Sequence, residues 1–184
     1  MQKRLALLPA IALTAAACST DPATSPRTPS APRFATSFTS ASAPSGAHYR
    51  NGFSEPECGP DGAGGFSCTG TAIAGVGNTD ATVLLSVSYS ATVQCRNRGG
   101  KIVDVKTQTT TDVSSDELTE LRNGTLFVSA VSAAAPSAES LLAAASCPNG
   151  NWTKILVGGS ASVTSYSYSL IFDGFSQPAI SISG

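Results

Sequence analysis

The residues of this chain that are best suited to chemical reactions are its five cysteines. Cys18 stands alone near the amino end, at the close of an apolar segment, and the other four lie further along, at Cys58, Cys68, Cys95 and Cys147. A cysteine sulfur can act as a nucleophile, ligate a metal or pair in a disulfide. Because the number is odd, one sulfur is left over if the others pair, and Cys18 is the one set apart.

Cys18 follows a segment with the features of a secretory signal. Lys3 and Arg4 precede an apolar stretch over residues 5–17, and this stretch ends in small residues. It is too short to span a bilayer, because a spanning helix needs roughly 20 apolar residues. We therefore expect residues 1–17 to be an export signal that is removed.

The residues that lead to Cys18, Leu-Thr-Ala-Ala-Ala-Cys, resemble the lipobox of bacterial lipoproteins, with Ala15 where leucine is usual. The resemblance implies that Cys18 becomes the first residue of the mature chain and carries a lipid that anchors it to the membrane. Ser19, in place of aspartate, implies the outer membrane of the cell envelope. An ordinary signal peptidase could cut the same bond and leave a secreted protein. Lipidation is the favoured interpretation, since a free thiol is reactive in an oxidising compartment.

Residues 18–49 are expected to form a disordered tether. They are rich in Ser, Thr, Pro and Ala, so little burial is available to offset the entropy cost of ordering. Phe34 and Phe38 interrupt this polarity and mark either an early strand or an apolar spot in the tether. The only histidine, His48, lies at its end. We expect His48 to be a solvated linker residue, because a catalytic base must be held in place.

Residues 50–184 have the size of one ordinary domain. Apolar and hydroxyl side chains alternate over residues 83–95, which predicts a long strand with one dry face and one hydroxyl-lined face. Weaker alternation recurs at residues 66–74, 101–110, 125–133, 152–157, 160–172 and 179–182. This pattern predicts an all-β fold, an antiparallel two-sheet sandwich, Ig-like in outline, with about six to eight strands. Short helices are expected around residues 114–121 and 136–145.

The four cysteines of this domain normally pair in an oxidising compartment, and three connectivities are possible on paper. Cys58 and Cys68 enclose a glycine-rich loop that has little else to hold it. Cys95 ends the long strand on its dry side, and Cys147 lies in a loop just before Trp152. We predict the disulfides Cys58–Cys68 and Cys95–Cys147. Zinc is disfavoured, because structural zinc sites use closely spaced cysteine pairs.

The segments at residues 95–100 (CRNRGG) and 147–152 (CPNGNW) resemble small secreted all-β bacterial proteins of unknown function. The resemblance covers about residues 66–175. It implies a fold and no activity.

Patterns of catalytic residues are scarce. The carboxylates form one cluster, made of Asp112, Asp116, Glu117 and Glu120. Two of them could serve glycoside hydrolysis across a cleft, but the exposed side of a short helix is the favoured interpretation. Asp61 and the loop at residues 78–80 offer oxygen ligands for calcium, though fewer than the six or more that it takes. We therefore expect no enzyme activity, no metal and no cofactor.

Two sets of residues are candidates for ligand binding. Arg96 and Arg98 lie beside a glycine turn, in the only basic cluster of the domain. They could recognise an anionic glycan or headgroup, although a solvated hairpin tip is the favoured interpretation. Tyr166 and Tyr168 share one strand face and are candidates for a sugar-stacking platform, whereas Trp152 is expected to pack in the core.

The charge balance excludes one class of partner. The chain carries 11 basic and 12 acidic residues, a formal net charge of −1. A duplex-binding protein needs a basic stripe to displace counterions, so we expect no nucleic-acid partner. The expected function is that of a lipid-anchored, non-enzymatic structural or interaction module of the cell envelope. The alternative is a module that binds carbohydrate or cell wall, with a glycan or an envelope protein as its partner.

Overall fold

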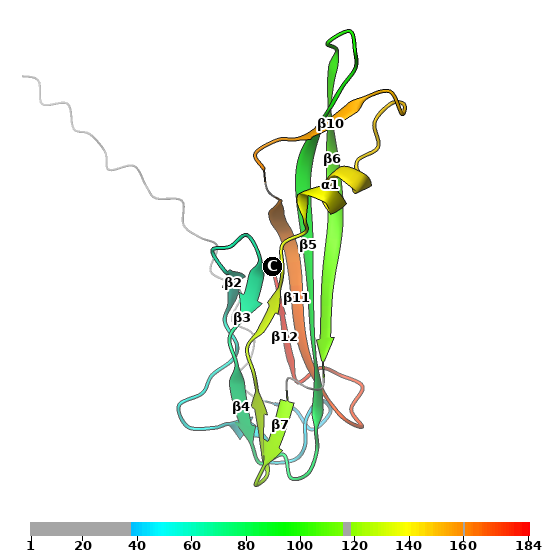
Figure 1. Cartoon of the computed structure of the whole chain (residues 1–184). Coiled ribbons are helices and arrows are strands. Elements are labelled where there is room, and N and C mark those ends of the chain that lie inside the picture. The colour runs from blue at the N-terminus through cyan, green and yellow to red at the C-terminus, as the bar shows by residue number, and fades with distance from the viewer. Residues whose placement is uncertain (1–37, 116–118, 160) are drawn as a thin grey trace, which may run out of the picture. The chain divides into compact units, whose positions relative to one another are not determined.

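The computed structural model describes residues 38–115, 119–159 and 161–184. In these residues twelve strands form three sheets, accompanied by one short helix (Figure 1). The sheets are antiparallel, so the fold is all-β and in outline a sandwich, as the alternating pattern predicts. It has more strands than expected, partly because the runs at residues 66–74 and 125–133 each divide into two short strands.

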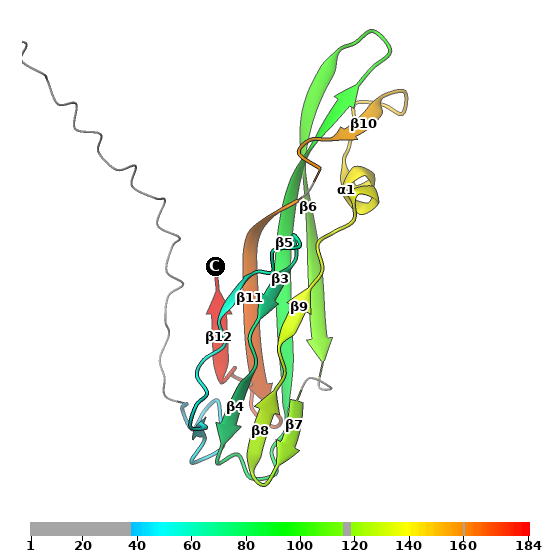
Figure 2. The same ribbon diagram turned by 60° about the vertical axis from the view of Figure 1, so that its left-hand side comes forward.

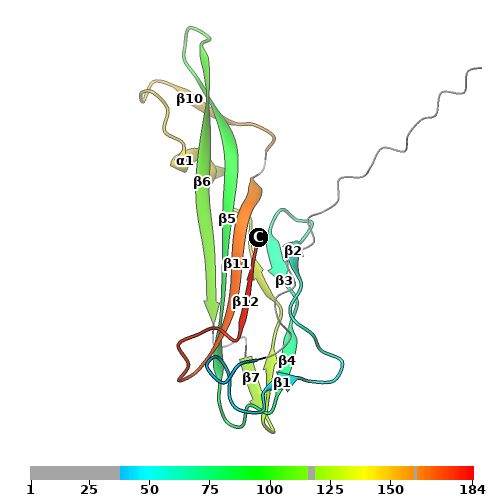
Figure 3. The same ribbon diagram turned by 180° about the vertical axis from the view of Figure 1, so that it is seen from behind.

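The largest sheet is built around β5 (Ala81–Arg96), the long strand with one dry face. β6 (Ile102–Ser115) pairs with β5 along one edge, from end to end. On the other edge, β11 (Ser162–Phe172) pairs with the first part of β5 and β10 (Thr153–Leu156) with its last part. β12 (Ile180–Ser183) then pairs with β11 (Figure 3). β5 is therefore the central strand of this sheet, paired on both sides.

A second sheet has the strand order β1, β4, β8, β7. These strands are short: β1 (His48–Tyr49), β4 (Thr71–Ala74), β8 (Thr125–Val128) and β7 (Thr119–Arg122). β7 and β8 form a hairpin whose turn contains Asn123, a non-glycine residue with a positive φ of 50°. The Asn-Gly pair at residues 123–124 thus forms the tight turn that its sequence predicts.

The third sheet consists of β2 (Cys58–Pro60), β3 (Phe66–Cys68) and β9 (Val131–Ala133). β3 leads into β4, and β8 leads into β9, so the second and third sheets follow one another along the same two chain segments (Figure 2). Gly70 lies between them. A Cβ at this position would lie 2.5 Å from the carbonyl oxygen of Val128, so only glycine allows the two segments to approach this closely.

The hydrophobic core lies between the large sheet and the two smaller ones. Odd-numbered residues of β5 turn inward and are buried, among them Val83, Leu85, Val87 and Tyr89. They share one cluster with buried residues of the smaller sheets, such as Phe66, Ile73, Leu126 and Val131. Burial of each large aliphatic side chain contributes about 2 kcal/mol. The dry face predicted for β5 is therefore the main surface on which this core is built.

The structure contains two disulfides, Cys58–Cys68 and Cys95–Cys147, which are the pairs that the sequence favours. Cys58 and Cys68 are direct cross-strand partners in β2 and β3, on either side of the glycine-rich loop. Cys95 is buried at the end of β5, on its dry side. Its disulfide holds the loop that precedes β10 against the large sheet.

One of the two expected helices is present. α1 (Ala138–Ala144) begins after Ser137, whose Oγ accepts a hydrogen bond from the amide of Ser140 at 3.1 Å. The helix expected around residues 114–121 is wrong: β6 runs to Ser115 and β7 begins at Thr119, while residues 116–118 lie outside the described part. Pairing with β5 overrides the local capping signal, because it gives β6 a continuous ladder of hydrogen bonds along one edge.

The folded domain begins earlier than residue 50, where the sequence places its boundary. Ala43 is buried, and the ring centroids of Phe38 and Tyr49 are 5.0 Å apart. His48 and Tyr49 form β1, which pairs with β4. The last part of the predicted tether therefore belongs to the domain, and His48 is a strand residue and not a linker residue.

Tyr166 and Tyr168 do not form an exposed platform. They share one face of β11, as predicted, but this face turns inward: Tyr168 is 1% exposed, and the Tyr166 ring lies 4.4 Å from that of Phe66. The register with β5 sets this direction, because Tyr168 lies opposite the buried Leu85. Burial raises the pKa of Tyr168, and the neighbouring Tyr49 adds to this. A sugar cannot stack on the buried Tyr168 ring, and the half-buried Tyr166 alone does not make a two-ring platform.

The two buried tyrosines generate a first prediction. The Tyr168 hydroxyl has no hydrogen-bond partner among the described residues, whereas the Tyr89 hydroxyl donates to the Ala133 carbonyl oxygen at 3.2 Å. Tyr168→Phe should therefore leave the free energy of unfolding unchanged or raise it, and Tyr89→Phe should lower it by about 1 kcal/mol. Urea unfolding of both variants checks this, and an equal loss in the two would contradict it.

The disulfides generate a second prediction. Removal of Cys95–Cys147, with a sequence separation of 52, should lower the free energy of unfolding by about 4 kcal/mol in the chain-entropy account. Removal of Cys58–Cys68, with a separation of 10, should cost about 2.5–3 kcal/mol. Paired alanine variants, compared by denaturant unfolding, test this order. A larger loss for Cys58→Ala with Cys68→Ala would show that the order is wrong.

Candidate functional site

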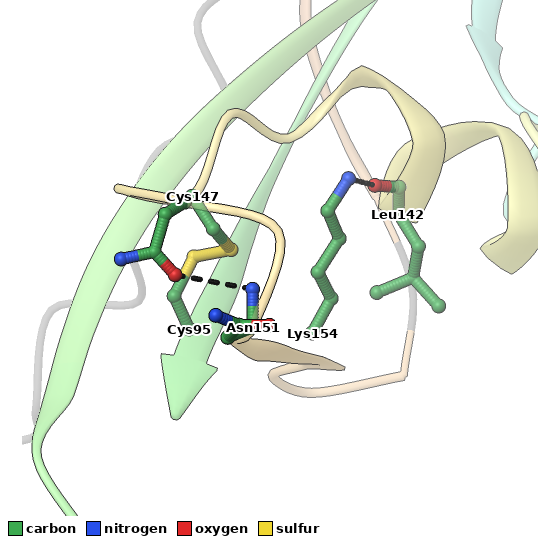
Figure 4. Close-up of a disulfide and its surroundings, with 6 residues drawn as sticks. Cys95, Leu142, Cys147, Asn151 and Lys154 are labelled. Atoms are coloured by element: carbon green, nitrogen blue, oxygen red, sulfur yellow. Dashed lines mark hydrogen bonds between the residues drawn. A yellow bond between two sulfur atoms is a disulfide. The ribbon is translucent and has the colours of Figure 1, made fainter. Parts of the chain in front are cut away.

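A polar depression of about 330 Å³ lies at the end of the hairpin formed by β5 and β6. Two chain segments line it: Asn97, Arg98 and Gly99 from the hairpin turn, and Asn149, Asn151 and Trp152 from the loop before β10. We call this depression the tip pocket. The Cys95–Cys147 disulfide joins the two segments directly (Figure 4).

The hairpin turn is held by its own hydrogen bonds. The amide of Asn97 donates to the carbonyl oxygen of Lys101 at 3.0 Å, and the amide of Lys101 donates to Oδ1 of Asn97 at 2.8 Å. Gly100 closes the turn with a φ of 81°, a conformation that glycine adopts without strain. Asn97 is thus fixed by both its backbone and its side chain, and Arg98 is exposed beside it.

The opposite wall is a second asparagine turn. Oδ1 of Asn149 accepts a hydrogen bond from the amide of Asn151 at 3.1 Å (Figure 4). The chain then enters β10, where Thr153 pairs with Arg96 and Lys154 with Cys95.

The loop before β10 is also anchored through Lys154, which follows it in β10. Nζ of Lys154 donates to the carbonyl oxygen of Leu142 in α1 at 2.8 Å, which ties β10 to the last turn of the helix (Figure 4). A disulfide, a strand ladder and a helix contact therefore position the same loop. The tip pocket is formed by the fold and does not depend on a ligand to assemble it.

The lining of the tip pocket offers aromatic, cationic and amide groups. Trp152 is half-buried and supplies an aromatic surface, and Arg98 supplies an exposed cation. The side-chain nitrogens (Nδ2) of Asn97 and Asn149 have no hydrogen-bond partner in the described part of the chain, so they are free to donate. The residues that line the pocket include no carboxylate and no histidine, the usual general acids and bases.

The structure separates the two arginines that the sequence grouped together. Arg98 lines the tip pocket, whereas Arg96 is the exposed last residue of β5 and is not among the lining residues. Trp152, expected in the core, instead lines the pocket. Sequence reasoning did not single out Asn97, Asn149 and Asn151. For Asn97 and Asn149 the signal was an asparagine two residues after Cys95 or Cys147, which is typical of turns.

The predicted acidic cluster is not assembled by the described residues. Asp112 lies in β6 of the large sheet, opposite Ser86, and Glu120 lies in β7 of another sheet. Glu120 accepts a hydrogen bond from Nε of Arg122 at 2.6 Å. Asp116 and Glu117 lie outside the described residues.

The two carboxylates considered for calcium hold their own loops. Oδ1 of Asp61 accepts hydrogen bonds from the amides of Ala63 and Gly65, each at 2.9 Å. Oδ1 of Asp80 accepts one from the amide of Ala81 at 2.8 Å. Among the residues that the structure describes, no group of three or more His, Cys, Asp or Glu side chains is placed to hold a metal ion.

In the same residues, no helix has the length and apolarity needed to cross a membrane. No known protein family, no curated protein and no solved structure matches this chain.

Proposed function

We propose that this protein is an exported, lipid-anchored and non-enzymatic binding module of the cell envelope, and that its ligand binds at the tip pocket. The observation that carries this proposal is the tip pocket itself, where a disulfide, a strand and a helix fix a polar loop beside a hairpin turn. The fold uses one of its two disulfides to build this feature.

The disulfides support the exported part of the proposal. Disulfides persist in oxidising compartments and are rare in the reducing cytosol. Both pairs lie within the folded domain, and Cys18 is the sulfur left over, at the end of the predicted signal segment. A lipid on Cys18 completes the use of all five cysteines and places the module at a membrane surface.

The lining of the tip pocket favours a glycan as the ligand, and an anionic one in particular. An aromatic side chain offers the apolar face of a sugar a surface to pack on. Amide donors match sugar hydroxyls, and the Arg98 guanidinium matches a carboxylate or phosphate group. A protein of the envelope is the second candidate, because the pocket is open and lies at the end of a hairpin.

The lipid anchor is tested by intact-mass spectrometry of protein isolated from its native host. The proposal predicts a chain that begins at Cys18, with the mass of acyl groups added and four sulfurs in two disulfides. Cys18→Ser should release the protein from membranes without unfolding it, because Cys18 is not part of either disulfide. An exported chain without added acyl mass would contradict the anchor.

The tip pocket is tested by binding to arrays of neutral and uronic-acid oligosaccharides and to isolated cell-wall polymer. Arg98→Ala and Trp152→Ala should each weaken binding by about tenfold or more, equivalent to about 1.4 kcal/mol. Arg96→Ala is the matched control, because it removes the same charge from the same hairpin outside the pocket. Equal weakening by Arg96→Ala would show that net charge, and not the pocket, is responsible.

A further inference from the structure

The large sheet ends on one side at β6, a strand of 14 residues. Its inner edge pairs with β5 over its whole length, without a shift in register. No strand and no backbone hydrogen bond of the described residues occupies its outer edge. On the other side of the same sheet, the outermost strands β10 and β12 have only four residues each. β6 is thus a long edge with unpaired backbone groups.

Backbone hydrogen bonds show which residues of β6 direct their N–H and C=O groups toward the outer edge. Lys101, just before β6, turns its carbonyl oxygen toward Asn97 and the inner edge. Because antiparallel strands alternate, the odd-numbered residues of β6 bond to β5 and the even-numbered ones direct their N–H and C=O groups away from it. The far edge of β5 agrees with this: the carbonyl oxygen of Thr92, an even position, accepts from Val157.

Natural sheets usually protect such an edge with proline, bulges or charged side chains, lysine above all. β6 contains no proline and no bulge, and its three charged residues, Asp104, Lys106 and Asp112, are of mixed sign. It is rich in threonine and valine, which favour extended pairing. An edge of this length and composition is suited to accept another strand.

We propose that β6 pairs with β6 of a second copy of this chain, antiparallel and centred on Thr109, so that two large sheets become one. In this register the even positions 106, 108 and 110 bond to positions 112, 110 and 108 of the other copy. Lys106 faces Asp112 on the outer surface, twice by symmetry, and Val105 faces Val113 on the inner surface. Neither Lys106 nor Asp112 has an ion-pair partner among the described residues of its own chain.

Charge and overlap favour this register over two alternatives. Centring the pair on Gln108 would place Asp104 against Asp112 twice, a repulsive arrangement. Centring it on Val105 would pair Lys106 with Asp104, but only about half of each strand would then overlap. The register centred on Thr109 combines opposite charges with overlap of residues 103–115. Because the strands are antiparallel, the two tip pockets lie at opposite ends of the joined sheet.

The first test uses charge reversal in the exported full-length chain that carries Cys18→Ser, measured by sedimentation equilibrium. The unaltered chain should form a dimer, and Asp112→Lys should weaken it by at least tenfold because two lysines then face each other. Asp104→Lys is the control: it changes the net charge equally but faces the uncharged position 114. Lys106→Asp combined with Asp112→Lys should restore the dimer. A monomer at all concentrations, as expected if another segment of the chain covers the edge, would overturn the proposal.

The second test uses cross-linking to check the register. Thr109 faces itself across the two-fold axis as a non-hydrogen-bonded pair, with Cα atoms about 4.5 Å apart, within the range for a disulfide. Thr109→Cys should therefore form a covalent dimer on oxidation. Thr111→Cys should not, because position 111 faces position 107. A dimer in which both variants or neither of them cross-link is held by a different surface, and the proposal would be wrong.

Discussion

The rest of the structure depends on β5, which is paired along both edges over most of its length. Its inner residues provide the surface on which the core packs, and its last residues carry the ladder to β10 and the Cys95 sulfur. Backbone pairing gives this strand two structural roles. The first part of β5 holds the sandwich together, and the last part projects and positions the tip pocket.

The tip pocket illustrates how a small domain can place a binding surface away from its core. A hairpin that continues beyond the other sheets would have little apolar burial to support it. Here Val93 and Cys95 of β5 and Leu141 of α1 are nevertheless buried. The Cys95–Cys147 disulfide, the four-residue β10 and the contact from Lys154 to α1 add to that burial. The asparagine side chains then fix both turns locally, which leaves Arg98 and Trp152 at the surface of a preformed site.

Much of the fold could be predicted from the sequence, because alternating apolar and polar residues directly indicate strands, and the odd number of cysteines sets Cys18 apart from the four that pair. Tyr166 and Tyr168 show the limit of this reasoning: alternation places them on one face, but only the register with β5 decides that this face is inward. Ser114 and Ser115 show another limit, since a local helix signal lost to long-range pairing. The tip pocket brings positions 97–99 together with positions 149, 151 and 152, a contact between distant segments that periodicity does not encode.

One doubly paired strand supports both the core and the tip pocket, and the Cys95–Cys147 disulfide holds the structure of the tip. Native-state hydrogen exchange, measured with and without Cys95–Cys147, tests this most directly. Removal of the disulfide lowers the free energy of unfolding, so all amides that exchange through global unfolding lose protection together. We expect the amides of residues 81–90 to remain the slowest to exchange in both forms, and those of residues 93–96 and 147–156 to exchange much faster than them only when the disulfide is absent. Equal protection throughout β5 in the absence of the disulfide, or slower exchange in β4 than in β5, would contradict this.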